Sequence, residues 1–214
     1  MYMYSKLIFD YVACAILLII IASLFVKQLY KSLADKIFMV INIIFLVASL
    51  ADILMGFMYA RLPITRGRQI VAYIFAYIYF TFRVSTIPVY TAYIYAISGT
   101  YYRLKNKFVR NIFYFPFYIL AIIIFSNVIN HKVFTISCET GYSRGPYMSI
   151  LYGISMLYAL FGTFYIITIK KYFTSEKWIA LLSMYILLFA SAIWQHINSR
   201  YLIEMFSSAL SLLL

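Results

Sequence analysis

The stretch 7–26 reads LIFDYVACAILLIIIASLFV, an apolar run in which Asp10 is the single charged residue. A helix that crosses the hydrocarbon layer of a bilayer needs about 20 mostly apolar residues. Comparable runs occupy 37–59, 69–97, 111–129, 147–169 and 178–197, and a shorter run occupies 201–214. This repetition predicts an all-α fold, a polytopic transmembrane helix bundle of about seven helices.

The amino-acid composition excludes a water-soluble domain. Of the 214 residues, 65% are hydrophobic and only 11% are charged, whereas soluble domains are about 45–50% apolar and about 25% charged. Disorder is excluded by the same figures, since disordered chains lack aromatic and branched aliphatic residues. We therefore expect residues 1–214 to form a single domain whose main partner is the lipid bilayer.

The net charge of +12 comes from 18 Lys and Arg against 6 Asp and Glu. In a soluble protein this excess would suggest nucleic-acid binding, but here the basic residues lie mostly in short connectors, so no nucleic-acid partner is expected. Connectors after the first, third and fifth runs hold ten Lys and Arg, and the opposite side holds seven. Because basic connectors favour the cytoplasm, the amino terminus is predicted to lie outside.

The last apolar run is short for a membrane span. Its 14 residues would cover about 21 Å as a helix, less than the roughly 30 Å of the hydrocarbon layer. We therefore expect most of a seventh helix that is truncated before it has crossed the membrane. A short re-entrant or tilted terminal helix is the alternative.

The sequence holds no recognisable catalytic constellation. It contains no phosphate-binding glycine loop, no nucleophile elbow, and no pair of Cys or His at metal-ligand spacing. His131 and His196 are far apart in the chain, as are Cys14 and Cys138. We therefore expect no catalytic residue, no cofactor and no metal site in this chain.

Charged residues inside the apolar runs are the sharpest functional signal. Asp52, Arg83 and Glu204 lie in such runs, where a charge is costly unless it is paired or hydrated and therefore faces the bundle interior. Gln195 and His196 lie near Glu204 in the chain, and all of these except the deeper Arg83 belong to the predicted outer half. Together the five residues suggest an outward-facing polar cavity that binds a ligand, to which Asp10 would also contribute.

Two other interpretations of these charges stay open. In the first, Asp52 and Arg83 form an internal ion pair, and Glu204 pairs with Arg200 or caps a helix; buried pairs alone are weak evidence of function. In the second, the charges form a proton or ion relay.

Two sequence motifs carry a family resemblance. One is YSRGP at 142–146, followed by ILY at 150–152 and by Lys170, Lys171 and Lys177; the other is LIEMF at 202–206, followed by Ala209 and the leucines at 212–214. With the seven-span layout, they resemble the amino-terminal membrane region of GGDEF-type signalling proteins from clostridial-type Firmicutes. Arg144, Gly145, Pro146 and Glu204 are the matching positions.

The resemblance implies a sensory input module in the bacterial plasma membrane. It implies an extracellular or membrane-soluble ligand, a homodimer, and a cytoplasmic diguanylate cyclase-like domain after the seventh helix. No GGDEF string occurs in this sequence, so the resemblance lends the chain no cyclase activity. A small transporter or channel subunit is the rival interpretation, and a membrane-embedded enzyme is a third.

Overall fold

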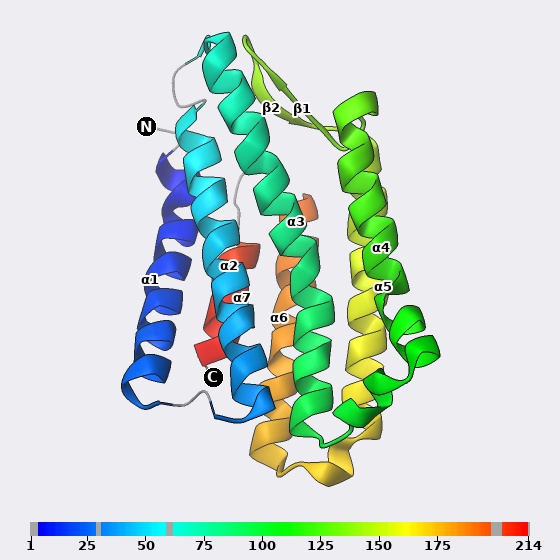
Figure 1. Cartoon of the computed structure of the whole chain (residues 1–214). Coiled ribbons are helices and arrows are strands. Elements are labelled where there is room, and N and C mark those ends of the chain that lie inside the picture. The colour runs from blue at the N-terminus through cyan, green and yellow to red at the C-terminus, as the bar shows by residue number, and fades with distance from the viewer. Residues whose placement is uncertain (1–3, 29–30, 59–61, 198–202, 214) are drawn as a thin grey trace.

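The protein is an all-α bundle of membrane-spanning length (Figure 1). The computed structural model describes residues 4–28, 31–58, 62–197 and 203–213. Its α-helices are α1 (Tyr4–Val26), α2 (Leu33–Met58), α3 (Arg66–Ile97), α4 (Lys107–Asn130), α5 (Tyr147–Thr168), α6 (Ser175–Ile197) and α7 (Glu204–Leu213). Short 3-10 helices, η1 (Tyr101–Lys105) and η2 (Lys170–Tyr172), precede α4 and α6.

Six of these helices are long and apolar enough to cross a membrane, which confirms a multi-pass membrane protein. The seventh, α7, is a 10-residue apolar helix and does not reach that length within the described residues. The predicted outside location of the amino terminus and the predicted truncation of the last helix stay predictions.

Several helices begin earlier than their apolar runs, because a polar cap rather than hydrophobicity sets the first turn. Before α2, Ser32 and Asp35 cap each other's backbone, with N···O distances of 3.0 and 3.1 Å. Before α4, the Asn106 side chain accepts a hydrogen bond from the Phe108 amide at 2.9 Å. These helices therefore reach beyond the predicted spans 37–59 and 111–129 into the basic connectors.

The longest helix, α3, contacts α2, α4 and α5. Its 32 residues extend about 48 Å, more than the roughly 30 Å hydrocarbon layer. Pro88 lies inside this helix and removes one backbone donor. Hydroxyl groups nearby bond back to the helix, with Thr86 donating to the Arg83 carbonyl at 2.6 Å and Thr91 to the Ile87 carbonyl at 2.8 Å.

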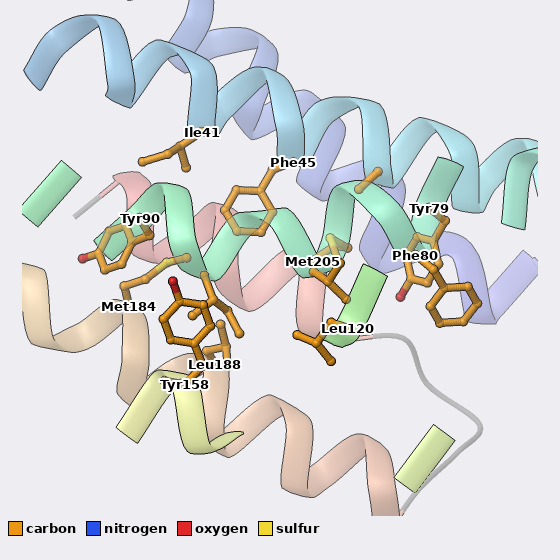
Figure 2. Packing of buried hydrophobic residues seen from close by; sticks show 14 of the residues in the cluster. Ile41, Phe45, Tyr79, Phe80, Tyr90, Leu120, Tyr158, Met184, Leu188 and Met205 are labelled. Carbon is orange, nitrogen blue, oxygen red and sulfur yellow. The ribbon is translucent and has the colours of Figure 1, made fainter. Parts of the chain in front are cut away.

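Small residues let the helices approach one another. Lipid tails are as apolar as leucine, so helices in a membrane associate through close packing and polar contacts. Fully buried alanines lie on most of the helices: Ala13, Ala48, Ala72, Ala76, Ala159 and Ala209. Larger side chains fill the spaces between helices, as Figure 2 shows for Phe45, Leu120 and Met205. Other large apolar side chains face outward, such as Ile122, which is 68% exposed.

A β-hairpin lies in the polar stretch 131–146 between α4 and α5. Strand β1 (Phe134–Ser137) pairs antiparallel with β2 (Gly141–Arg144), with Phe134 opposite Arg144. Figure 1 shows the hairpin at the end of the bundle where α3 begins, opposite the end that carries η1 and η2. Strands of four residues are too short to give a clear alternating pattern, so the sequence did not reveal them.

Polar side chains from α3 and α4 hold the hairpin on the bundle. Gln69 donates to the Ile136 carbonyl at 2.6 Å, and the Tyr73 hydroxyl accepts from the Ile136 amide at 3.0 Å. The buried Asn127 accepts from the Val133 amide at 2.7 Å and donates to the Phe134 carbonyl at 3.0 Å. These bonds satisfy backbone groups that would otherwise be buried without partners.

The hairpin ends at Gly145, where two backbone segments approach closely. Its amide donates to the Val133 carbonyl at 2.8 Å, and the Tyr147 amide donates to the Lys132 carbonyl at 2.9 Å. A Cβ on Gly145 would collide with the backbone of Lys132. This gives a structural reason for glycine at one of the positions that carry the family resemblance.

We predict that Gly145→Ala lowers stability, because the added methyl group forces these backbones apart. Overpacking of this kind costs roughly 1–3 kcal/mol, which would lower the midpoint of thermal unfolding in detergent. Gly153→Ala is the matched control, since a Cβ there meets nothing within 4 Å and alanine favours a helix. Equal midpoints for the two variants would show that the close approach is not required.

Candidate functional site

An ion pair in the bundle interior joins α3 to α7. Nε of Arg83 donates to Oε1 of Glu204 at 2.9 Å, and Nη2 of Arg83 donates to Oε2. The side chains are only 7% and 11% exposed. Within the described residues it is the only salt bridge, and its two-pronged geometry is the strong form of an arginine–carboxylate contact.

Aromatic rings surround the guanidinium group of Arg83. Its Cζ lies 4.7 Å from the ring centroid of Tyr152 on α5 and 5.9 Å from that of Tyr79 on α3. Contacts of a cation with an aromatic face are worth about 2 kcal/mol when desolvated. Arg83 therefore links α3, α5 and α7 in one cluster.

A small cavity lies beside the ion pair. Arg83, Glu204, Tyr152 and Ser155 contribute to its lining, and about 20 Å³ is open to the centre of a water molecule. A cavity of roughly 10–15 Å³ on this measure holds one water. The space beside Arg83 is thus large enough for one water molecule, which is able to carry a proton, and too small for an organic ligand.

The position of α7 along the length of the bundle explains why Glu204 reaches Arg83. Helix α7 begins at Glu204, and Figure 1 shows α7 at mid-height in the bundle rather than at its upper end. A carboxylate in the first turn also interacts favourably with the positive end of the helix dipole. Buried serines, Ser207, Ser208 and Ser211, let α7 pack closely against α1, α2 and α6.

Asp52 is not the ion-pair partner of Arg83, although it interacts electrostatically with Arg83 and Glu204. It lies on α2, 1% exposed, and its Oδ2 has no hydrogen-bond partner. The alternative of an Asp52–Arg83 pair is therefore replaced by an Arg83–Glu204 pair. Arg200, the other suggested partner of Glu204, lies outside the described residues.

A second buried carboxyl group lies next to Asp52. Asp10 on α1 is 0% exposed, neither of its carboxylate oxygens has a hydrogen-bond partner, and it interacts electrostatically with Asp52. Ser49, one turn before Asp52, also has an unpartnered buried hydroxyl. A lone ionised carboxylate is very costly in such surroundings, so these groups suit the binding of a proton or a small cation.

The remaining predicted site residues lie in two places. Gln195 and His196 belong to the last turn of α6, but their side chains are outside the described residues. Arg144 is the last residue of β2, and Gly145 and Pro146 connect it to α5; Arg144 interacts electrostatically with Asp52. The hairpin therefore brings one of its charges toward the α2 carboxylate.

Tyr142 on β2 belongs to the same neighbourhood. Burial raises the pKa of its phenol above the ordinary value, and Arg144, Tyr152, Asp52 and Arg83 all contribute to its electrostatic environment. The phenol is thus neutral at physiological pH. The hairpin end of the bundle and the intramembrane charges therefore form one connected polar region.

Sequence reasoning missed the aromatic partners of Arg83. Tyr79 lies one helical turn before Arg83, a spacing that places both on one face of a helix, so it was within reach of a pattern argument. Tyr152 belongs to the ILY string at 150–152 but lies on another helix, and no spacing in the sequence relates it to Arg83.

Among the described residues, no three His, Cys, Asp or Glu side chains come together as a metal site would require. The chain matches no family model, no curated protein and no solved structure. Functional inference therefore rests on the geometry of the charged residues.

We predict strong energetic coupling between Arg83 and Glu204. Arg83→Gln and Glu204→Gln should each destabilise the protein by about 3–5 kcal/mol, because each leaves a buried charge without its partner. The double variant should lose much less than the sum of the two, since both charges are removed. Denaturant unfolding in mixed micelles measures the free energies.

The pair Arg83→Gln and Asp52→Asn is the matched control for this cycle. Because Asp52 makes no hydrogen bond with Arg83, its coupling energy should be much smaller than that of the Glu204 cycle. Stronger coupling of Arg83 to Asp52 than to Glu204 would contradict the described pairing.

Proposed function

We propose that this chain is a membrane-embedded signal-input module in which α7 carries the response. The observation that supports this most directly is the Arg83–Glu204 pair, which ties the short α7 to the long α3. The resemblance of the sequence to GGDEF-associated membrane regions agrees with such a role.

The pair has the energetic properties of a switch. A signal changes a protein only if it binds two arrangements with different affinities. Loss of the Glu204 charge would leave Arg83 unpaired at a cost of about 3–5 kcal/mol, whereas a tenfold population shift needs only about 1.4 kcal/mol. Displacement of Glu204 from Arg83 therefore involves enough free energy to shift the balance between two positions of α7.

Asp10 and Asp52 are suited to sense the signal. Both are buried and have unpartnered carboxylate oxygens, and Asp52 interacts electrostatically with Arg83 and Glu204. A proton or cation that binds at these carboxyl groups changes the field at the ion pair. Asp10 and Asp52, the proposed input site, thus act on the response helix α7 through electrostatic interactions.

By resemblance, the response of α7 would pass to a cytoplasmic diguanylate cyclase-like domain, with two copies of the chain acting together. Coding sequence that continues beyond residue 214 into such a domain would support this part of the proposal. An uninterrupted continuation without a signalling domain would contradict it.

We predict that Glu204→Gln loosens α7 selectively. Hydrogen–deuterium exchange of the α7 amides should rise at least tenfold, because the contact that anchors the first turn is lost. Glu176→Gln is a matched control in the first turn of α6, and its exposed side chain should leave α7 exchange unchanged. Unaltered exchange in Glu204→Gln would exclude α7 as the responding element.

A small transporter or channel subunit is the second candidate function. The observation in its favour is the presence of two buried carboxyl groups on adjacent helices, Asp10 on α1 with both oxygens and Asp52 on α2 with Oδ2 lacking a hydrogen-bond partner. Intramembrane carboxylates are characteristic of proton relays. The two candidates differ in whether a bound proton crosses the membrane.

Proton flux into proteoliposomes distinguishes the two functions. For a signal-input module we expect a flux no greater than that of protein-free liposomes. Flux that is lost in Asp10→Asn and Asp52→Asn, yet kept in Glu139→Gln on the exposed hairpin turn, would instead establish transport.

A further inference from the structure

A large apolar groove runs between α4 and α5 at the bundle surface. Its volume is about 570 Å³, within the range of roughly 300–1,000 Å³ typical of ligand pockets. Phe108, Ile112 and Pro116 of α4 and Leu157 of α5 line it, with Phe113 and Tyr158 also contributing. Because its rim residues are lipid-facing, with Leu157 68% and Phe108 73% exposed, the groove opens toward the bilayer.

Pro116 accounts for the separation of the two helices here. A proline inside a helix removes a hydrogen bond and bends the chain, and Figure 1 shows the first turns of α4 standing away from the rest of the bundle. The Phe113 carbonyl, one turn before Pro116, accepts a hydrogen bond from the Tyr158 hydroxyl at 2.6 Å. This bond satisfies the Tyr158 hydroxyl within the bundle, so the polar end of this side chain is not left open to the groove.

Positive charge gathers at one end of the groove. Phe108 and Val109 of the groove lining lie between Lys107 and Arg110 in the chain, and Arg103 and Lys105 precede them in η1. Lys105, Lys107 and Arg110 are exposed, and no acidic residue occurs between 98 and 138. Since basic residues in the first turn oppose the helix dipole, an anion at this end would be strongly favoured.

We propose that this groove binds one anionic phospholipid. An acyl chain occupies the apolar groove between α4 and α5, and the phosphate group contacts Lys105, Lys107 and Arg110. The apolar lining suits the hydrocarbon tail, the opening toward the bilayer gives a lipid direct access, and the basic end is complementary to the head group. The proposal is independent of the function proposed for Arg83 and Glu204.

Native mass spectrometry of the 214-residue chain in detergent tests this site, with phosphatidylglycerol and phosphatidylcholine as probes. We expect one phosphatidylglycerol to be retained at least tenfold more tightly than phosphatidylcholine. Lys105→Gln/Lys107→Gln should abolish that preference, because each basic residue near an anionic head group contributes substantially to its binding. Lys170→Gln/Lys171→Gln is the matched control, which removes two charges from η2 and should retain the preference.

A second pair of variants tests the tail site. Ile112→Trp fills the groove and should reduce retention of both lipids, whereas Ile122→Trp, on the exposed face of the same helix but not in the groove lining, should not. Equal retention of the two lipids by the unmodified chain would overturn the proposal. So would equal effects of the two tryptophans, since both results describe ordinary lipids around the bundle.

Discussion

The guanidinium group of Arg83 is buried in the bundle interior, away from bulk solvent that would stabilise its charge, and this places the strongest constraint on the bundle. The carboxylate of Glu204 and the rings of Tyr79 and Tyr152 meet the requirement. Three helices must therefore keep fixed positions around one side chain. Glu204 thereby ties the short helix α7 to α3.

The polar groups of the protein form a connected region from the hairpin to the ion pair. Asn127 and Gln69 hold the hairpin backbone, Arg144 interacts with Asp52, and Asp52 interacts with Arg83 and Glu204. Apolar contacts in a membrane give little preference for one helix arrangement over another. A change of charge at Asp52 or its charged neighbours can therefore shift the balance between two arrangements of the helices. The proposed input module requires this property.

The membrane helices could be predicted closely because length and hydrophobicity act locally. Residues 147–169 were expected as a span and form α5 at Tyr147–Thr168. Helix starts were missed where a cap such as Asn106 extends a helix into a polar connector. The hairpin was missed because its stability comes from side chains distant in sequence, such as Tyr73, rather than from its own four-residue strands.

The candidate site also combines features that follow from the local sequence with features that only the tertiary structure determines. That Asp52, Arg83 and Glu204 face the interior followed from the cost of charge in hydrocarbon, which depends only on each residue and its apolar neighbours in the chain. Which carboxylate Arg83 meets did not follow, because 121 residues separate Arg83 from Glu204 and the depth of α7 decides the pairing. Packing among α1, α2, α6 and α7 set that depth, and it left Asp10 and Asp52 buried with unpartnered oxygens.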